Sequence, residues 1–304
     1  MSIDLERVLG NERLLRAVTS LDRAEFDRLL AAFEKRWALQ RRRRTAKGGQ
    51  RERAAGAGNK GALPSAAHKL LFILFYFKCY PLQEVQALLF GFGQPQACYW
   101  VGLLTPLLHS ALGHEKQLPA RRPADLERLL QDCPELRELL IDGTERPIRR
   151  PQDKGRRKRL YSGKKKRHTR KNVLLASLKE KRVLYLSPTR PGREHDRKVA
   201  EKAALRFPEG CTLLQDSGFQ GYKPAGVATL QPKKKPRGQE LNASWRLVNR
   251  AISSVRVGIE HVIASVKRCR IVLEPLRNWR RGFADAAMLG ACGLHNLRME
   301  MRAA

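Results

Sequence analysis

Apolar positions in residues 3–40 follow one another three or four places apart, which is the spacing of one helix face. The pattern breaks near Ser20, a residue type that often caps a helix N-terminus. We therefore expect two helices here, with Ser20 as the N-cap of the second. The following residues, 41–62, are rich in Arg, Gly and Ala and offer almost nothing to bury, so they predict a mobile basic linker that contacts DNA or is simply solvated.

Residues 64–113 predict a compact helical region with a helix-turn-helix. Pro81 and Pro95 stand where helices would start, and Gly91 and Gly93 mark the turn between the last two helices. The spacing also suits a plain helical bundle, so this pattern leaves both interpretations open.

Beyond a proline-containing joint at 119–123, short apolar runs alternate with helical ones. This order predicts a mixed α/β layout in which helices pack on a sheet. We expect strands at 135–142, 171–180, 181–189 and 211–216, and helices at 194–207, 243–268 and 283–299.

The charge narrows the class of partner. The chain holds 61 Lys and Arg against 29 Asp and Glu, a net charge of +32, which favours nucleic acid as the partner. The basic residues are spread along the chain, unlike a membrane-binding cluster, and the apolar run at 70–77 is too short to span a bilayer. Scattered cysteines and an N-terminus without a signal-like apolar stretch lead us to expect a cytoplasmic protein with no membrane partner.

Three acids form the candidate chemistry. Asp142 and Asp216 each end an apolar strand, and Glu260 lies on the flank of the buried face of the helix at 243–268. Each alone has an ordinary explanation: an aspartate before Gly or Ser is a common turn former, and Glu260 can pair with Arg256 one turn away. Together they are what a two-metal phosphoryl-transfer site needs, since such ions require hard carboxylate oxygens on rigid elements.

At these residues the chain resembles bacterial insertion-sequence transposases that carry an Asp, Asp, Glu triad, in the branch related to eukaryotic harbinger elements. The resemblance rests on IDGTERPIRRP followed by YSGKKKRHTRKN, on LQDSGFQGY, on NRAISSVRVGIEHVIASVKRCRI, and on LPSAAHKLLFILFYFKCYPLQEVQALLF nearer the N-terminus. It covers nearly the whole chain.

The resemblance implies an RNase H-like catalytic domain at 121–304, after N-terminal helices and linker at 1–60 and a helix-turn-helix DNA-binding domain at 61–120. It implies binding to terminal inverted repeats, cleavage and strand transfer to target DNA, with two Mg²⁺ or Mn²⁺ ions and a homodimer that pairs the two ends. In a bacterium such a protein is expected in the cytoplasm, associated with the nucleoid.

By position, the resemblance assigns the metal-binding, catalytic role to Asp142, Asp216 and Glu260. Arg256 and Lys267 match the family's Arg, Glu, Lys spacing and are expected to contact DNA. Ser253 departs from the family, which often has tyrosine there. The His195–Asp196 pair also matches, but we expect Asp196 to cap the following helix.

Two further groups are expected to touch DNA. One is the basic run at 149–171, which follows Asp142 closely and is expected to rim the active site and neutralise phosphates, with a solvated loop as the alternative. The other is the start of the second helix of the helix-turn-helix, which would face the groove. The residues expected to contact DNA are Arg149, Arg150, Tyr161, Lys164, Lys165 and Lys166 in the first group, with Tyr161 stacking on an unpaired base, and Gln94, Gln96 and Tyr99 in the second.

Two other functions remain open from the residues: a domesticated, catalytically silent DNA-binding regulator derived from a transposase, and a structural RNA-binding protein. The intact acids argue against the first, and the same acids with the long apolar core argue against the second.

Overall fold

We describe the protein from a computed structural model, in which residues 3–43, 61–235 and 240–303 are described. The chain divides into two compact units. Unit 1 comprises residues 1–118, 268–271 and 286–301, and unit 2 comprises 119–267, 272–285 and 302–304. Most of the predicted basic linker lies outside the described residues. The domain boundaries at 60 and 120 stay predictions.

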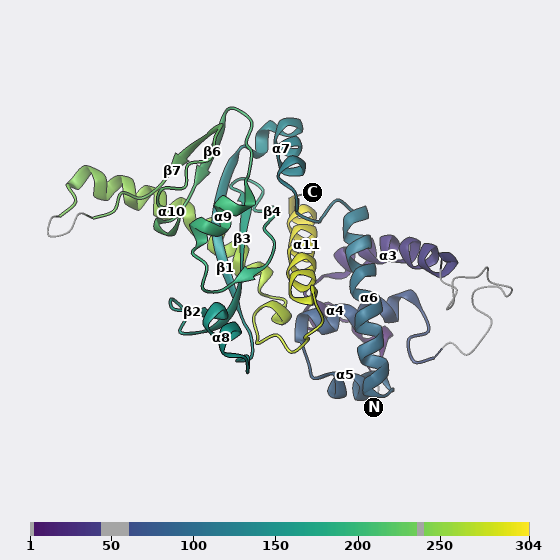
Figure 1. The fold of residues 1–304 in the computed structure, drawn as a ribbon. Helices are drawn as coiled ribbons and strands as arrows, with labels where there is room; N and C mark the ends of the chain where they lie inside the picture. Colours follow the sequence, from purple (N-terminus) through teal and green to yellow (C-terminus); the bar gives the residue numbers. More distant parts are fainter. Residues whose placement is uncertain (1–2, 44–60, 236–239, 304) are drawn as a thin grey trace. The chain divides into compact units, whose positions relative to one another are not determined.

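Unit 1 is helical (Figure 1). Its α4 is buried almost all round from Lys69 to Phe77. No helix among the described residues is long and apolar enough to cross a membrane. The helices of unit 1 are α1 (Leu5–Leu9), α2 (Glu12–Thr19), α3 (Arg23–Arg43), α4 (Ala66–Cys79), α5 (Gln83–Phe90), α6 (Gln94–His114) and residues 286–301 of α11 (Phe283–Ala303).

The N-terminal segment holds three helices, so the prediction of two was wrong. Ser20 does break the pattern, but it ends α2 in the left-handed conformation, with φ 70°, and does not cap α3. The cap is Asp22, whose carboxylate accepts from the Glu25 N–H while Glu25 accepts from the Asp22 N–H, both at 2.9 Å. This reciprocal arrangement is a capping box, which satisfies two backbone donors at once.

The predicted turn between the last two helices of the region is present. Gly91 ends α5 with φ 74°, a conformation that glycine adopts without steric strain, and Gly93 is the N-cap of α6. Pro95 lies in the first turn of α6, whereas Pro81 precedes the start of α5 by two residues.

The C-terminal helix α11 packs closely within unit 1. A Cβ atom placed on Gly290 would stand 2.6 Å from Phe77 of α4, and one on Gly293 would stand 2.9 Å from Leu112 of α6. Only glycine permits this approach.

Unit 2 is built on one mixed sheet in the order β2-β3-β1-β6-β7, with β4 and β5 also paired to β3 (Figure 1). β1 runs antiparallel to β3 and parallel to β6, and β6 runs parallel to β7. The mixed α/β layout predicted from the sequence is thereby confirmed. The strands are β1 (Glu138–Pro147), β2 (Tyr161–Ser162), β3 (Arg167–Ser177), β4 (Val183–Leu186), β5 (Arg190–Pro191), β6 (Cys211–Leu214) and β7 (Val227–Leu230).

Helices cover both faces of β1. Leu139 and Ile141 join a core cluster with Leu126 and Leu130 of α7 (Pro123–Asp132) and with residues of α9 (Asp196–Ala203). Leu140, whose side chain alternates to the other face, meets α10 (Ala243–Val266). β1 is therefore buried on both faces, which explains why its first half is a continuous apolar run in the sequence and does not alternate with polar residues.

Several elements of unit 2 differ from the expectation, among them the short strands β2, β5 and β7, which the sequence did not predict. α7 lies just past the predicted joint, and α8 (Lys154–Leu160) forms inside the basic run, where Asp153 caps it through a 2.7 Å bond from the Arg156 N–H. On α10, Ile259, Val262 and Val266 are buried as expected, but Val255 is 38% exposed. The apolar stripe of α10 thus reaches beyond the sheet that it packs on.

Candidate active site

The register of the parallel strands brings the two aspartates together. Leu140 of β1 is paired with Leu214 of β6. Asp142 and Asp216 each follow two residues later, so they stand at neighbouring positions where β6 has ended and β1 continues to Pro147. The predicted strand at 135–142 was therefore wrong in its end, because β1 goes on pairing with β3 beyond Asp142. Asp216 closes a turn there, accepting from the Gly218 N–H at 2.7 Å. Its side chain thus has the local turn role that the sequence allowed, and it also faces Asp142.

α10 carries Glu260 to the same place. A Cβ atom on Gly258 would lie 3.3 Å from Leu140 Cδ1 and 3.1 Å from Lys181 Nζ, so the absence of a side chain lets α10 approach β1 closely. Because side chains two apart on a strand share a face, α10 crosses the face of β1 that also carries Asp142. Glu260 follows Gly258 by two residues and is exposed toward this opening.

These residues line one cavity of about 390 Å³, here called the carboxylate cavity. It contains all three predicted acids, both predicted α10 cations and two of the three predicted loop lysines. Its lining is Asp142, Gly143, Thr144, Glu145, Lys164, Lys165, Asp196, Asp216, Arg256, Glu260, Ile263, Ala264 and Lys267.

Burial, together with neighbouring negative charge, makes Asp142 difficult to ionise. The pKa of Asp142 is raised to about 6, chiefly by burial and also by the nearby carboxylates of Asp216 and Asp196, against the lowering effect of a hydrogen bond from the Gly143 N–H. That hydrogen bond is 2.7 Å long. A carboxylate in this position is poised to gain from a nearby cation.

Asp196 corrects the sequence-based assignment. The N-cap of α9 is His195, which makes no side-chain capping bond, so the prediction that Asp196 caps this helix was wrong. Its carboxylate pairs instead with Lys171 of β3 at 3.0 Å and lies against Gly143, where a Cβ atom would stand 2.3 Å away. Asp196 is therefore a fourth acid of the cavity.

Glu145 is a further lining acid that sequence reasoning missed. Burial alone would raise the pKa of Glu145, but hydrogen bonds from Thr169 and Ser162 and the Lys171 ammonium outweigh it and lower the pKa. Thr169 donates at 2.6 Å and Lys171 lies at 3.3 Å. The sequence shows only that Glu145 follows Asp142 by three residues. The alternation of side chains along a strand does not tell a cavity-lining glutamate from one that faces solvent.

The two cations of α10 complete the wall. Arg256 lies 3.9 Å from the Asp216 carboxylate, a distance at the limit of an ion pair. Burial lowers the pKa of Lys267, and the neighbouring Lys165 ammonium lowers it further. A bound anion would therefore reduce the repulsion between the Lys267 and Lys165 ammonium groups.

The remaining predicted residues of the basic run divide between surface and a second hollow. Arg149 and Lys166 are exposed and line neither cavity. Arg150 and Tyr161 line a shallow hollow with Arg157, Lys158 and Arg193, where the Tyr161 ring meets His168 edge-on at 5.5 Å.

In unit 1, the three residues predicted to read bases lie at the start of α6 but differ in availability. Gln96 is exposed and Tyr99 is 56% exposed. The side-chain amide of Gln94 donates to Gln83 of α5 at 3.0 Å. Gln94 thus stiffens the turn between the two helices.

The carboxylate cavity suits a hard divalent cation by its chemistry. Asp142, Asp216 and Glu260 supply carboxylate oxygens from β1, from the turn after β6 and from α10, and a cation would favour the ionised form of the buried Asp142 carboxyl group. The spacing is open, because no group of three His, Cys, Asp or Glu in the described ranges is set to hold a metal ion as it stands.

The chain is similar to known proteins over most of its length. The model of the DDE superfamily endonuclease family matches residues 141–296, just over half of the chain. The chain is also similar to a protein of Microchaete diplosiphon described as "Probable transposase for insertion sequence element IS702", with 27% identity over 235 residues, 77% of this chain and 81% of that one. No solved structure matches significantly.

Proposed function

We propose that this chain, which belongs to the DDE superfamily endonucleases, acts as the DNA transposase of its own element. It binds the terminal inverted repeats of that element, cuts the DNA there, and joins the freed 3′-hydroxyls to target DNA. The observation that carries the proposal is the convergence of Asp142, Asp216 and Glu260 on one cavity with cations at its rim. The insertion-sequence protein that it resembles over most of its length supports the same activity.

Asp142, Asp216 and Glu260 would hold two Mg²⁺ or Mn²⁺ ions, which supply activation of the attacking oxygen and stabilisation of the leaving one. Asp142 within β1 and Asp216 just after β6 each follow the paired residues Leu140 and Leu214 by two places, so the sheet holds their positions. Arg256 beside Asp216 holds that carboxylate in place and faces the phosphates on either side of the scissile bond.

Phosphate binding falls to the lysines and arginines around the cavity. Lys164, Lys165 and Lys267 line it directly, and their positive charges crowd one another until a polyanion binds. Arg149, Arg150 and Lys166 extend the cationic surface along the flanking strand, and Tyr161 stacks on an unpaired base in the adjacent hollow.

Recognition of the element's ends belongs to α6. Gln96 and Tyr99 are exposed at its first turns and are the groups that reach base edges, while Gln94 orients the turn through Gln83. Two copies of the chain, one on each end, make the synaptic homodimer. A charge of +32 keeps the protein on the nucleoid in the cytoplasm.

The test uses the full-length protein and a plasmid that carries both ends of the element as found beside the gene. With Mg²⁺ present we expect cuts at the repeat ends and covalent joining of those 3′ ends to a second plasmid. The same plasmid with scrambled ends is the control. Cutting that is equal on both plasmids, or ends that never join, would contradict the proposal.

A further inference from the structure

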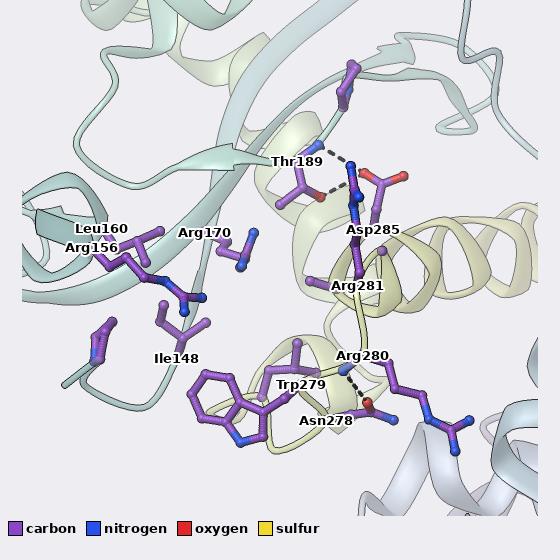
Figure 2. Close-up of a pocket in the computed structure, with 15 residues that line it drawn as sticks. Ile148, Arg156, Leu160, Arg170, Thr189, Asn278, Trp279, Arg280, Arg281 and Asp285 are labelled. Atoms are coloured by element: carbon purple, nitrogen blue, oxygen red, sulfur yellow. Dashed lines mark hydrogen bonds between the residues drawn. The ribbon is translucent and has the colours of Figure 1, made fainter. Parts of the chain in front are cut away.

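A second cavity of unit 2 contains none of the three acids. It encloses about 490 Å³ and is walled by the end of β1, by α8, by β3 and by the segment 276–285 (Figure 2). That segment is fixed to β1, because Leu276 donates to the Pro147 carbonyl at 3.2 Å and pairs with Ile148. We call it the arginine cavity, after Arg156, Arg170, Arg280 and Arg281 in its lining.

Three arginines of this cavity, Arg156, Arg170 and Arg281, face no carboxylate partner in the described part of the chain. The cavity's one lining acid, Asp285, is engaged by the guanidinium of Arg121 and by Thr189, whose N–H and hydroxyl donate to it at 2.9 and 2.8 Å. The pKa of Arg170 is lowered by burial and by Arg156, which is the sign of cations held together without an anion.

An indole stands beside these cations. Trp279 is 62% exposed although tryptophan is usually well covered, and it lines the cavity together with apolar groups such as Ile148 and Leu276. Figure 2 shows the Trp279 ring and the guanidinium groups of Arg156 and Arg170 facing one open space. The cavity thus offers a flat apolar surface and a cationic one to the same ligand.

We propose that the arginine cavity binds one unpaired nucleotide of a DNA strand, with its phosphate on Arg156 and Arg170 and its base against Trp279. The inference rests on the proposed function only in taking DNA as the ligand. Arginine binds phosphate with a planar fork, and aromatic side chains stack on any base whose face is free.

Shape favours an unpaired nucleotide over a duplex. The bases of a duplex are stacked, so their faces are hidden, and a duplex is read by protein elements that protrude into its grooves. A concave site receives a group that protrudes from the DNA instead. Its volume lies within the range of about 300–1,000 Å³ that small-ligand sites occupy.

The sheet fixes how far this nucleotide lies from the cut. Asp142 and Ile148 are six residues apart, with β1 extended to Pro147 between them, or about 20 Å at the rise of a strand. At about 3.4 Å per nucleotide along a stacked strand, the unpaired base lies within roughly six nucleotides of the scissile bond.

The experiment places one unpaired 5-iododeoxyuridine within six nucleotides of the element end, in an otherwise paired duplex, and irradiates it with the full-length protein at saturation. We expect a photo-crosslink to the peptide that contains Trp279, and about tenfold tighter binding than to the fully paired duplex. Trp279→Ala should lose the crosslink and bind the DNA with the unpaired nucleotide no more tightly than the fully paired duplex. Trp279→Phe should restore most of the preference for the unpaired nucleotide.

Trp245→Ala is the matched control, because Trp245 is another partly exposed tryptophan of unit 2 that lines neither cavity. One face of its ring is occupied by the Lys233 ammonium, 4.2 Å from the ring centre. This variant should keep the crosslink and the preference. A wild-type crosslink on Trp245 or Tyr161, or no crosslink at saturation, would overturn the inference. Mg²⁺-dependent cutting of paired ends, measured in parallel, separates its failure from failure of the proposed activity.

Discussion

The carboxylate cavity and the arginine cavity are both reached by the chain of β1 but differ in the charged groups that line them. β1 contributes Asp142 to the first and the residue after its end, Ile148, to the second, while β3 contributes Arg170 to the second alone. In the carboxylate cavity, Asp142 is buried beside the carboxylates of Asp216 and Asp196, and this acidic cluster calls for a metal cation. In the arginine cavity the neighbouring like charges are arginines, which call for a phosphate. Each cavity is incomplete in the protein alone, and the sign of its unbalanced charge indicates the missing partner.

The largest effect is expected from removing the acids. Asp142→Ala, Asp216→Ala or Glu260→Ala should lower Mg²⁺-dependent cutting of repeat-ended DNA about 1,000-fold or more, since a metal ion supplies several kcal/mol at the transition state. DNA binding should persist. Cutting is measured on end-labelled DNA, and Asp125→Ala, which removes an exposed acid paired with Arg122 on α7, is the control. Any of the three variants that still cuts at the wild-type rate removes that acid from the set.

The second prediction is that variants of the two cavities change the stability of the fold with different dependence on pH. Asp142 ionises with a pKa of about 6 in the folded protein, against the ordinary value of 3.8 for an aspartate in the unfolded chain. Its charge therefore destabilises the fold increasingly between about pH 4 and 6, and by a constant amount above pH 6. That amount is at most about 3 kcal/mol. Asp142→Asn, which keeps an acceptor for the Gly143 N–H, should therefore raise Tm in metal-free buffer at pH 7.5 and leave it nearly unchanged at pH 4.

Arg170→Gln relieves the opposite repulsion and gives the contrast. Arginine stays charged over this whole pH range, so any gain in Tm should be the same at pH 4 and pH 7.5. A gain for Asp142→Asn that is also independent of pH would mean that charge is not the cause.

How much the sequence predicts depends on whether the cause is local. Asp142, Asp216 and Glu260 follow from local patterns, because apolar runs end at each aspartate and the helix period places Glu260 beside the buried face. Asp196 was assigned wrongly because its place before a helix is typical of a cap, whereas its partner, Lys171, comes from a strand 25 residues earlier. The arginine cavity has no local signal, since its walls come from separate segments that meet only through the fold.

The third prediction tests the rim of the carboxylate cavity. Replacing Lys164, Lys165 and Lys166 together with Gln should weaken specific and random DNA alike and flatten the slope of log affinity against log salt by up to about three units. Lys166, which does not line the cavity, should contribute least. Affinity is measured by fluorescence anisotropy over a range of NaCl concentrations.

The control for this series neutralises Arg122, Arg128 and Arg206, which are exposed cations of unit 2 that line neither cavity. An equal flattening in the control would show that the slope reports only total charge. An unchanged slope in the lysine variant would mean that these side chains point into water.

The smallest effect is expected outside both cavities. Gln96→Ala in the full-length chain should reduce the preference for the terminal repeat over random duplex by about 1–3 kcal/mol if Gln96 makes a bidentate base contact, with cutting chemistry unchanged. Gln94→Ala should do less, because Gln94 is bonded to Gln83. Competition gel shifts measure the preference. The same preference in wild type and Gln96→Ala would assign base reading to another part of the chain.

The central claim, that Asp142, Asp216 and Glu260 hold the metal, is tested most directly by iron-directed cleavage of the protein itself. Fe²⁺ replaces Mg²⁺ in the DNA complex, ascorbate and peroxide are added, and the positions of backbone cuts are read by mass spectrometry. We expect cuts near residues 142, 216 and 260, suppressed by excess Mg²⁺ and absent in Asp142→Asn. Cuts that persist in Asp142→Asn, or that cluster at other acids such as Asp285 in the arginine cavity, would contradict it.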